Sequence, residues 1–187
     1  MKTEITKILE SLVPWKAKVL LAKPGLSQNQ RVWTADELSK AAQSYPGKPV
    51  MSDHGETCDK LVGITVKAYY GSGSKGEGLY ADAIGLMDRD LFSKLEGLPE
   101  KSIPPLLKGV SIGGLGNLDS EKRVVDFEPL EWSFTPFPGI PDAQVLELAE
   151  LKESIQQRRR MIESGTYGPG HTFGRVDMRL YERKRKR

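Results

Sequence analysis

Two alternating segments joined by a glycine-rich connection constrain the fold most strongly. In "LVGITVKAYY" (61–70) the apolar side chains recur at every second position, at Val62, Ile64, Val66, Ala68 and Tyr70. A period of two is typical of a half-buried β-strand. The segment "LYADAIGL" (79–86) predicts the returning strand, and "GSGSKGEG" between them predicts a flexible connection. We therefore expect a long β-hairpin in a chain whose body is mostly β.

Further strands are expected on both sides of this hairpin. The run "AKVLLA" (17–22) predicts a buried strand, and "LLKGVSIGGLGNL" (106–118) combines a short apolar run with several glycines. The segment "KRVVDFEPLEWSFTP" (122–136) predicts one or two more strands. The body from about residue 15 to 145 is thus expected to consist of mostly short strands with two helices.

The expected helices are marked by capping residues. Thr34 with Glu37 three residues later is a capping-box pattern that opens a helix over 34–45. Asp88 is placed to cap a short helix in "DRDLFSKLEGL".

The C-terminal part divides into two expected segments. From Ala143 to about Ser164 the apolar spacing is helical, with Leu148, Leu151, Ile155 and Ile162 on one face. After Gly165 the composition changes to glycine, proline and basic residues, which predicts a mobile tail. We expect a body over 1–145, a C-terminal helix over 146–164 and a flexible basic tail over 165–187.

Composition narrows the class of protein. The chain has 187 residues and 38% hydrophobic residues, which suits one soluble domain with appendages. No run approaches the roughly 18 apolar residues of a membrane helix, and the acids and lysines of "MKTEITKILESLV" do not fit a signal peptide. The single cysteine, Cys58, excludes an intrachain disulfide and a cysteine-based metal cluster, and favours a reducing, cytosolic setting.

The positive charge is concentrated at the end of the chain. The net charge is +3, and the last seven residues, "YERKRKR", supply five basic side chains. Without them the rest is close to neutral, which argues against a broad nucleic-acid surface.

Ser111, in "KGVSIGG", is a candidate nucleophile. A serine hydroxyl needs a neighbouring base and backbone N–H groups aimed at the oxyanion, and Gly113 and Gly114 are candidates to provide these donors. Taken alone, the segment is more typical of a strand-end serine before a glycine-rich turn.

His54, in "PVMSDHGET", is the only histidine inside the expected body. Its imidazole has the pKa range of a general base, although a loop histidine between acids is more often an exposed polar residue. Asp53 and Glu56 raise the alternative of a metal site, which the absence of a second histidine nearby disfavours.

Glu131 is the candidate acid. In "LEWSF" the alternation places Leu130, Trp132 and Phe134 on one face and Glu131 with Ser133 on the other. An acid at such a position can orient a histidine and stabilise its cationic form. The alternative is a glutamate that faces solvent.

Two further residues receive no catalytic role. Cys58 is interpreted as a small packing residue, because four residues of separation from His54 in one loop is not a catalytic arrangement by itself. His171 lies in the expected flexible tail, which lacks elements to hold it.

The order of these motifs resembles that of the prohead proteases of tailed bacteriophages, capsid-maturation serine proteases related in fold to herpesvirus assemblin. The resemblance covers about residues 17 to 145 and is carried by six segments: "NQRVWTADELSKAA", "GKPVMSDHG", "LVGITV", "GLYADAIG", "KGVSIGG" and "PLEWSFTPFPGIPDAQV". Each segment alone is only weakly specific for this family, whereas the six segments in the family's order are more specific.

The resemblance implies an α+β fold, with a barrel-like, mostly antiparallel β-sheet wrapped by helices. It implies Ser111 as nucleophile, His54 as general base and Glu131 as the third member of the triad. This chain departs from the pattern at Gly114, where the family often has an aromatic or other large residue, and this leaves the oxyanion donors Gly113 and Gly114 open.

The resemblance also implies a biological role. The body 1–145 would be a protease domain that cleaves scaffold protein, scaffold-like segments of the capsid protein and itself, inside the procapsid in the host cytoplasm. A homodimer or higher assembly is expected, with no cofactor, metal, membrane or nucleic-acid partner. Two alternatives stay open: a non-catalytic capsid-assembly module on the same fold, and a small β-domain that binds nucleic acid through its basic tail.

Overall fold

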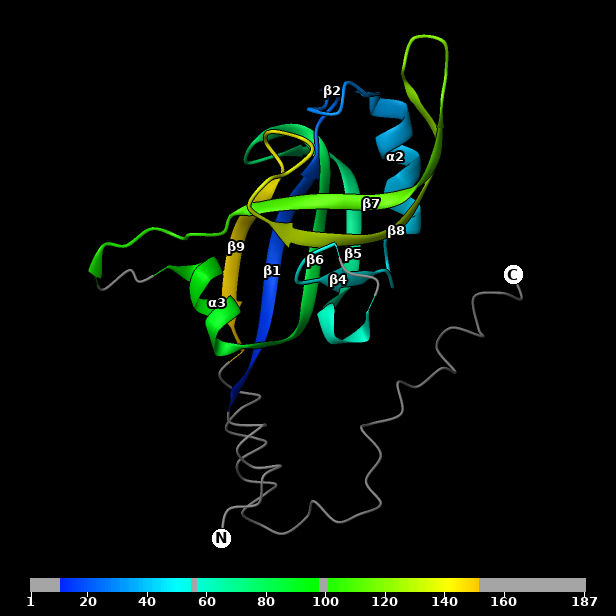
Figure 1. The fold of residues 1–187 in the computed structure, drawn as a ribbon. Helices are drawn as coiled ribbons and strands as arrows, with labels where there is room; N and C mark the ends of the chain where they lie inside the picture. Colours follow the sequence, from blue (N-terminus) through cyan, green and yellow to red (C-terminus); the bar gives the residue numbers. More distant parts are fainter. Residues whose placement is uncertain (1–10, 55–56, 98–100, 152–187) are drawn as a thin grey trace, which may run out of the picture. The chain divides into compact units, whose positions relative to one another are not determined.

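Seven strands arranged in a closed ring form the body of the protein (Figure 1). The computed structural model describes residues 11–54, 57–97 and 101–151. Around the ring the strands follow the order β1-β6-β5-β4-β8-β7-β9. All neighbours are antiparallel except β4 and β8, which are parallel. The expected α+β class, mostly β with two helices, is confirmed at this level.

The elements have the following bounds. The ring strands are β1 (Leu12–Ala22), β4 (Pro49–Met51), β5 (Leu61–Gly73), β6 (Gly76–Asp88), β7 (Gly109–Leu118), β8 (Val124–Thr135) and β9 (Gln144–Glu150). Outside the ring lie β2 (Gly25–Leu26), β3 (Val32–Trp33), α2 (Ala35–Ser44), the 3-10 helix η1 (Cys58–Lys60) and α3 (Arg89–Glu96). In Figure 1, β7 and β8 run across the direction of β1, β6 and β9.

The expected hairpin is confirmed as β5 and β6, but its inward face differs from the prediction. The register of β5 with β6 shifts between Thr65 and Lys67, and its register with β4 shifts between Leu61 and Gly63, which marks two β-bulges. Ile64 and Val66 are 46% and 53% exposed, while Thr65 between them is 1% exposed. The simple alternation was wrong at these positions because a bulge changes which side chains face inward.

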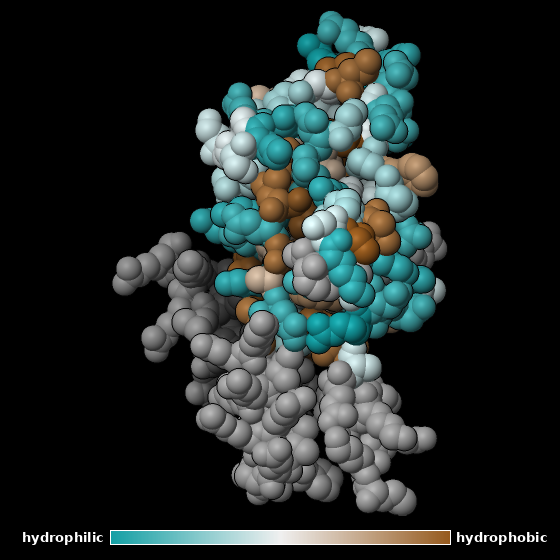
Figure 2. All heavy atoms as spheres, turned by 90° about the vertical axis from the view of Figure 1, so that its left-hand side faces the viewer, coloured by the Kyte–Doolittle hydropathy of each residue, from teal (hydrophilic) through white to brown (hydrophobic). Residues whose placement is uncertain are grey.

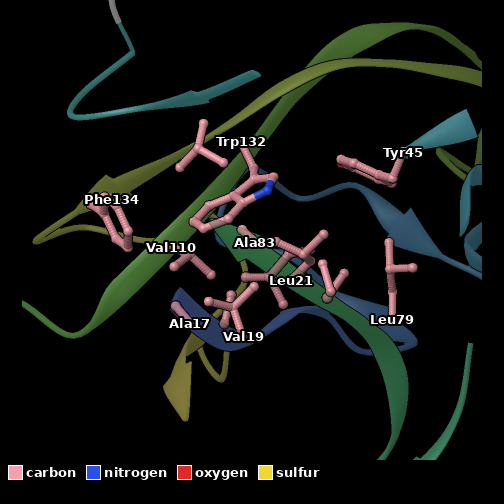
Figure 3. Close-up of a cluster of buried hydrophobic side chains, with 14 of the residues drawn as sticks. Ala17, Val19, Leu21, Tyr45, Leu79, Ala83, Val110, Trp132 and Phe134 are labelled. Atoms are coloured by element: carbon pink, nitrogen blue, oxygen red, sulfur yellow. The ribbon is translucent and has the colours of Figure 1, made fainter. Parts of the chain in front are cut away.

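Aromatic rings from two strands pack together in the core. Trp132 and Phe134 of β8 meet edge to face, with ring centroids 5.2 Å apart, and Phe134 contacts Trp15 of β1 at 5.7 Å. Figure 3 shows Trp132 and Phe134 among aliphatic side chains of β1, β6 and β7. Trp15 has room because Gly63 and Gly85 face its ring, where a Cβ would overlap it. This packing fixes the orientation of β8.

Both helices begin as their capping residues predict. The Thr34 side chain accepts a hydrogen bond from the N–H of Glu37, and the Asp88 side chain accepts one from Leu91. The Glu37 carboxylate does not complete a capping box. It is buried and accepts the backbone N–H of Phe127 at 2.5 Å, which ties α2 to β8.

The segment expected to begin a C-terminal helix is a strand over the described residues. β9 pairs along β1 from Leu20–Gln144 to Trp15–Glu150, and it meets β7 at Gly109–Gln144. The helical interpretation of 146–150 is therefore wrong. Without β9, the β1 and β7 edges would lack backbone partners, and this tertiary pairing outweighs a helical apolar spacing. The remainder of the expected helix and the tail, 152–187, lies outside the described residues.

Apolar side chains also reach the surface. On the face shown in Figure 2 they form separate groups between hydrophilic ones. The most exposed large apolar residues are Phe137 at 83% and Leu106 at 75%. Within the described ranges no helix is long and apolar enough to cross a membrane.

Replacing Tyr45 by phenylalanine is expected to leave stability unchanged or raise it by about 1 kcal/mol. The Tyr45 hydroxyl is buried and makes no hydrogen bond with the residues that the structure describes. Phenylalanine keeps the ring and removes a polar atom that lost its hydration on folding. Chemical denaturation of wild type and Tyr45→Phe measures the difference.

Tyr80→Phe is the matched control. Tyr80 is also buried, but its hydroxyl donates to the Gly76 carbonyl at 2.6 Å. This variant should lose about 1 kcal/mol. A loss of the same size in Tyr45→Phe would contradict the assignment of an unpaired hydroxyl.

Candidate active site

The parallel pairing of β4 with β8 brings His54 to β8. Met51 lies opposite Ser133 in the register, and His54 follows Met51 by three residues. The Asp53 carboxylate accepts the backbone N–H of His54 at 2.8 Å and shapes the loop there. Asp53, which the sequence analysis considered only as part of a disfavoured metal site, therefore helps to set the course of the chain at His54.

The His54 ring is held by two side chains of β8. Its Nδ1 lies 2.9 Å from Glu131 Oε1 and 3.1 Å from Ser133 Oγ. Ser133 in turn donates its hydroxyl proton to Glu131 Oε2 at 2.5 Å. The His54 side chain is 45% exposed and that of Glu131 is 19% exposed. The expected contact between His54 and Glu131 is thus present, and Ser133 joins it.

This network selects one tautomer of the histidine. An ionised Glu131 accepts hydrogen bonds only, so Nδ1 must carry the proton that it donates to Oε1. The lone pair of the neutral ring is then on Nε2. All hydrogen bonds between the ring and described residues use Nδ1, so Nε2 is available as a base.

Ser111 stands on the strand next to this network. It lies directly opposite Ser133 in the β7–β8 register. Side chains at directly opposed positions of an antiparallel pair lie on the same face, with Cβ atoms about 4.5–5.5 Å apart. Ser111 is half-buried, and within the described part of the chain no hydrogen bond joins its hydroxyl to His54. Catalytic hydrogen bonds of substrate-free enzymes often close only when substrate binds.

Gly113 and Gly114 have packing roles. A Cβ at Gly113 would overlap the carboxylate of Glu131, its partner in the register. Gly113 therefore leaves the space in which Glu131 reaches His54. A Cβ at Gly114 would overlap the Glu128 carbonyl and the Phe127 ring. The expected role of both glycines as oxyanion donors stays a prediction.

A second loop approaches Ser111 from the other side. The Gly139 carbonyl accepts the backbone N–H of Gln28 at 2.8 Å. An ideal Cβ built on Gly139 would lie 3.9 Å from Ser111 Oγ and 3.7 Å from Asn29 Nδ2. Sequence analysis gave no role to Asn29 or Gly139, because only tertiary contacts bring them to Ser111.

Tyr45 adds a buried hydroxyl that interacts with the charge of Glu131. Burial raises the pKa of Tyr45 well above its usual value, and the charge of Glu131 raises it further. Tyr45 therefore stays protonated and neutral over the working pH range. Tyr45 therefore adds no negative charge of its own near Glu131.

Among the other sequence candidates, Cys58 makes no hydrogen bond with the described residues of the site. Cys58 is exposed at the start of η1, so its interpretation as a packing residue was wrong: every residue of this short helix is exposed. Glu56 and His171 lie outside the described residues. In the described ranges no group of three or more histidine, cysteine, aspartate or glutamate side chains is arranged to hold a metal ion.

Comparison with known proteins assigns no family, since no protein-family model matches the chain and no curated protein matches it. Functional inference therefore depends on the residues and on the geometry of the site.

Gly113→Ala is expected to displace Glu131 from His54. The added methyl group requires the space of the carboxylate, so Nδ1 loses its carboxylate acceptor and keeps only Ser133, whose hydroxyl can donate as well as accept. Nitrogen-15 NMR of the imidazole measures the tautomer, and the chain has only two histidines to assign. Wild-type His54 should be protonated on Nδ1 when neutral, and the variant should lose this preference.

Gly116→Ala on the same strand is the control. Its Cβ would meet Phe127 atoms at 3.4–3.5 Å, which is ordinary contact. This variant should keep the wild-type tautomer. An unchanged Nδ1–H tautomer in Gly113→Ala would refute the proposed role of Gly113 in seating Glu131.

Proposed function

We propose that this protein is a serine endopeptidase of the prohead-protease type, with Ser111 as nucleophile, His54 as general base and Glu131 as the orienting acid. The observation that carries the proposal is the His54 Nδ1–Glu131 Oε1 contact of 2.9 Å, one strand away from Ser111. An acid on Nδ1 leaves Nε2 as the base, which is the arrangement that serine proteases use.

The chemistry follows from these roles. Ser111 Oγ attacks the carbonyl carbon of a peptide bond while His54 Nε2 takes its proton. The carbonyl becomes an oxyanion, and Glu131 stabilises the imidazolium that forms. His54 then gives the proton to the leaving amine, which departs as the peptide bond breaks. Water, deprotonated by His54, attacks the acyl-enzyme. The ester bond to Ser111 Oγ then breaks, His54 returns the proton to Oγ, and the carboxylic acid product leaves.

Ser133 acts in this scheme as a positioning residue. It is buried on the same face as Glu131 and donates to the second carboxylate oxygen. A carboxylate held at both oxygens keeps one orientation toward His54. Ser133 is a poor alternative nucleophile, because it is fully buried and its proton is engaged by Glu131.

The resemblance to prohead proteases supplies the proposed substrate. The ring of seven strands with two helices is compatible with the barrel-like fold of that family, and the six motifs occur in its order. We place the activity in procapsid maturation in the host cytoplasm. The substrates are scaffold protein, scaffold-like segments of the capsid protein and the chain itself, and the protein works as a homodimer or higher assembly.

Ser111→Ala and His54→Ala should each abolish processing, with a loss of about 10⁴-fold or more in rate. The test is co-expression of the full chain with its cognate capsid and scaffold proteins, followed by intact-mass measurement of all components. Cys58→Ser is the control. It removes the only thiol from an exposed position and should process at the wild-type rate.

The same experiment separates the alternatives. Processing by Ser111→Ala at the wild-type rate would refute the assigned nucleophile. Assembly without any cleavage by wild type would favour the non-catalytic capsid-assembly module. Loss of processing in Cys58→Ser would point to a thiol mechanism instead.

A further inference from the structure

The loop before α2 is held in one defined shape. Ser27 is buried, its N–H donates to the Arg31 carbonyl at 2.8 Å, and its hydroxyl accepts the Arg31 N–H at 3.1 Å. Gln30 has a φ of 59°, a left-handed conformation that closes a tight turn. This turn presents Asn29 at its exposed tip.

The tip is fastened to the loop that follows β8. The Gln28 N–H donates to the Gly139 carbonyl at 2.8 Å. The second loop is itself anchored, because the Phe137 N–H donates to the Thr135 hydroxyl at 3.2 Å. The place of Asn29 relative to Gly139 is therefore set by backbone hydrogen bonds rather than by its own side chain.

A small space beside Gly139 lies within 4 Å of both Asn29 and Ser111. The ideal Cβ position of Gly139 is 3.7 Å from Asn29 Nδ2 and 3.9 Å from Ser111 Oγ, and no other described atom outside its immediate chain neighbours comes within 4 Å. The Asn29 amide makes no hydrogen bond within the described ranges. A nucleophile and an amide donor are thus both close to this space.

We propose that Asn29 Nδ2 donates a hydrogen bond to the oxygen of the scissile carbonyl and stabilises the oxyanion that forms on it. The proposal rests on the proposed endopeptidase function. A reacting carbonyl must lie about 3 Å both from the nucleophile and from the oxyanion donors, and the space beside Gly139 offers such a place. An amide suits this role because it donates without adding a charge that must be desolvated.

Gly113, one of the two glycines expected from sequence for this role, is less well suited. The space over Gly113 is occupied by the Glu131 carboxylate, which would repel an oxyanion. Gly139, in contrast, has no side chain, and the position that a Cβ would take is open and lies 3.9 Å from Ser111 Oγ. Asn29 is therefore a catalytic residue in this scheme and Gly139 provides the room for substrate.

A fluorophosphonate probe tests this assignment, because its phosphonyl oxygen takes the place of the oxyanion when Ser111 is labelled. The full chain is treated with the probe, and the second-order rate constant is measured by intact mass with peptide mapping of the modified serine. Asn29→Ala should label about 100-fold more slowly than wild type. Gln28→Ala, which removes the neighbouring exposed amide but keeps the backbone N–H, should label at the wild-type rate.

Gly139→Ala provides a second variant, in which the Asn29 amide is kept. Its methyl group would have only ordinary contacts at 3.7 and 3.9 Å, so the variant should melt at the wild-type temperature. The methyl nevertheless fills the space for the oxygen, and labelling should fall by at least about tenfold.

The outcomes distinguish this inference from the function on which it rests. Labelling of wild type at Ser111 with an equal rate in Asn29→Ala overturns the role of Asn29 and leaves the endopeptidase intact. Absence of labelling at Ser111 in wild type overturns both. A slow Asn29→Ala with an unchanged melting temperature supports the inference, and slow labelling that tracks a lowered melting temperature refutes it.

Discussion

The parallel pairing of β4 with β8 is the constraint on which the site depends. Two residue pairs, Val50–Trp132 and Met51–Ser133, join the β5 side of the ring to the β8 side. His54 follows Met51, the last residue of this pairing, by three residues. The position of the histidine is therefore a consequence of closing the ring, and the ring cannot open at this point without separating His54 from Glu131.

One face of β8 packs in the core, and the other face carries side chains of the candidate active site. Trp132 and Phe134 point into the core, and the Trp132 indole donates to the buried Thr65 hydroxyl at 2.9 Å. Glu131 and Ser133, at the alternate positions, point toward His54. Close packing tolerates little movement of the large rings, so the same contacts that bury Trp132 fix the direction of the Glu131 carboxylate.

Sequence patterns predicted the helix starts and the face of Glu131, because helix capping and strand alternation depend on residues that are close in sequence. The alternation around Glu131 placed the acid on the face opposite Trp132, and Thr34 and Asp88 marked the starts of both helices. The bulge at Val66 was missed because a register shift depends on the partner strand. β9 was missed for the same reason: its strand conformation comes from pairing with β1 and β7.

Contacts between distant segments could not be predicted from the residues alone. Nothing in "PVMSDHGET" indicates that a strand of three residues will pair in parallel with β8. Ser133 was placed on the same face as Glu131 but received no role, since its contact with His54 spans 79 positions of sequence. Asn29 and Gly139 meet only through the backbone bond of Gln28.

The most direct measurement of the central claim is a crystal structure of the full chain after reaction with a fluorophosphonate. The proposed mechanism predicts a phosphorus–oxygen bond at Ser111 Oγ, with His54 Nε2 facing that oxygen and Nδ1 still hydrogen-bonded to Glu131. An unmodified Ser111, or a His54 ring turned so that Nε2 contacts Glu131, would contradict it.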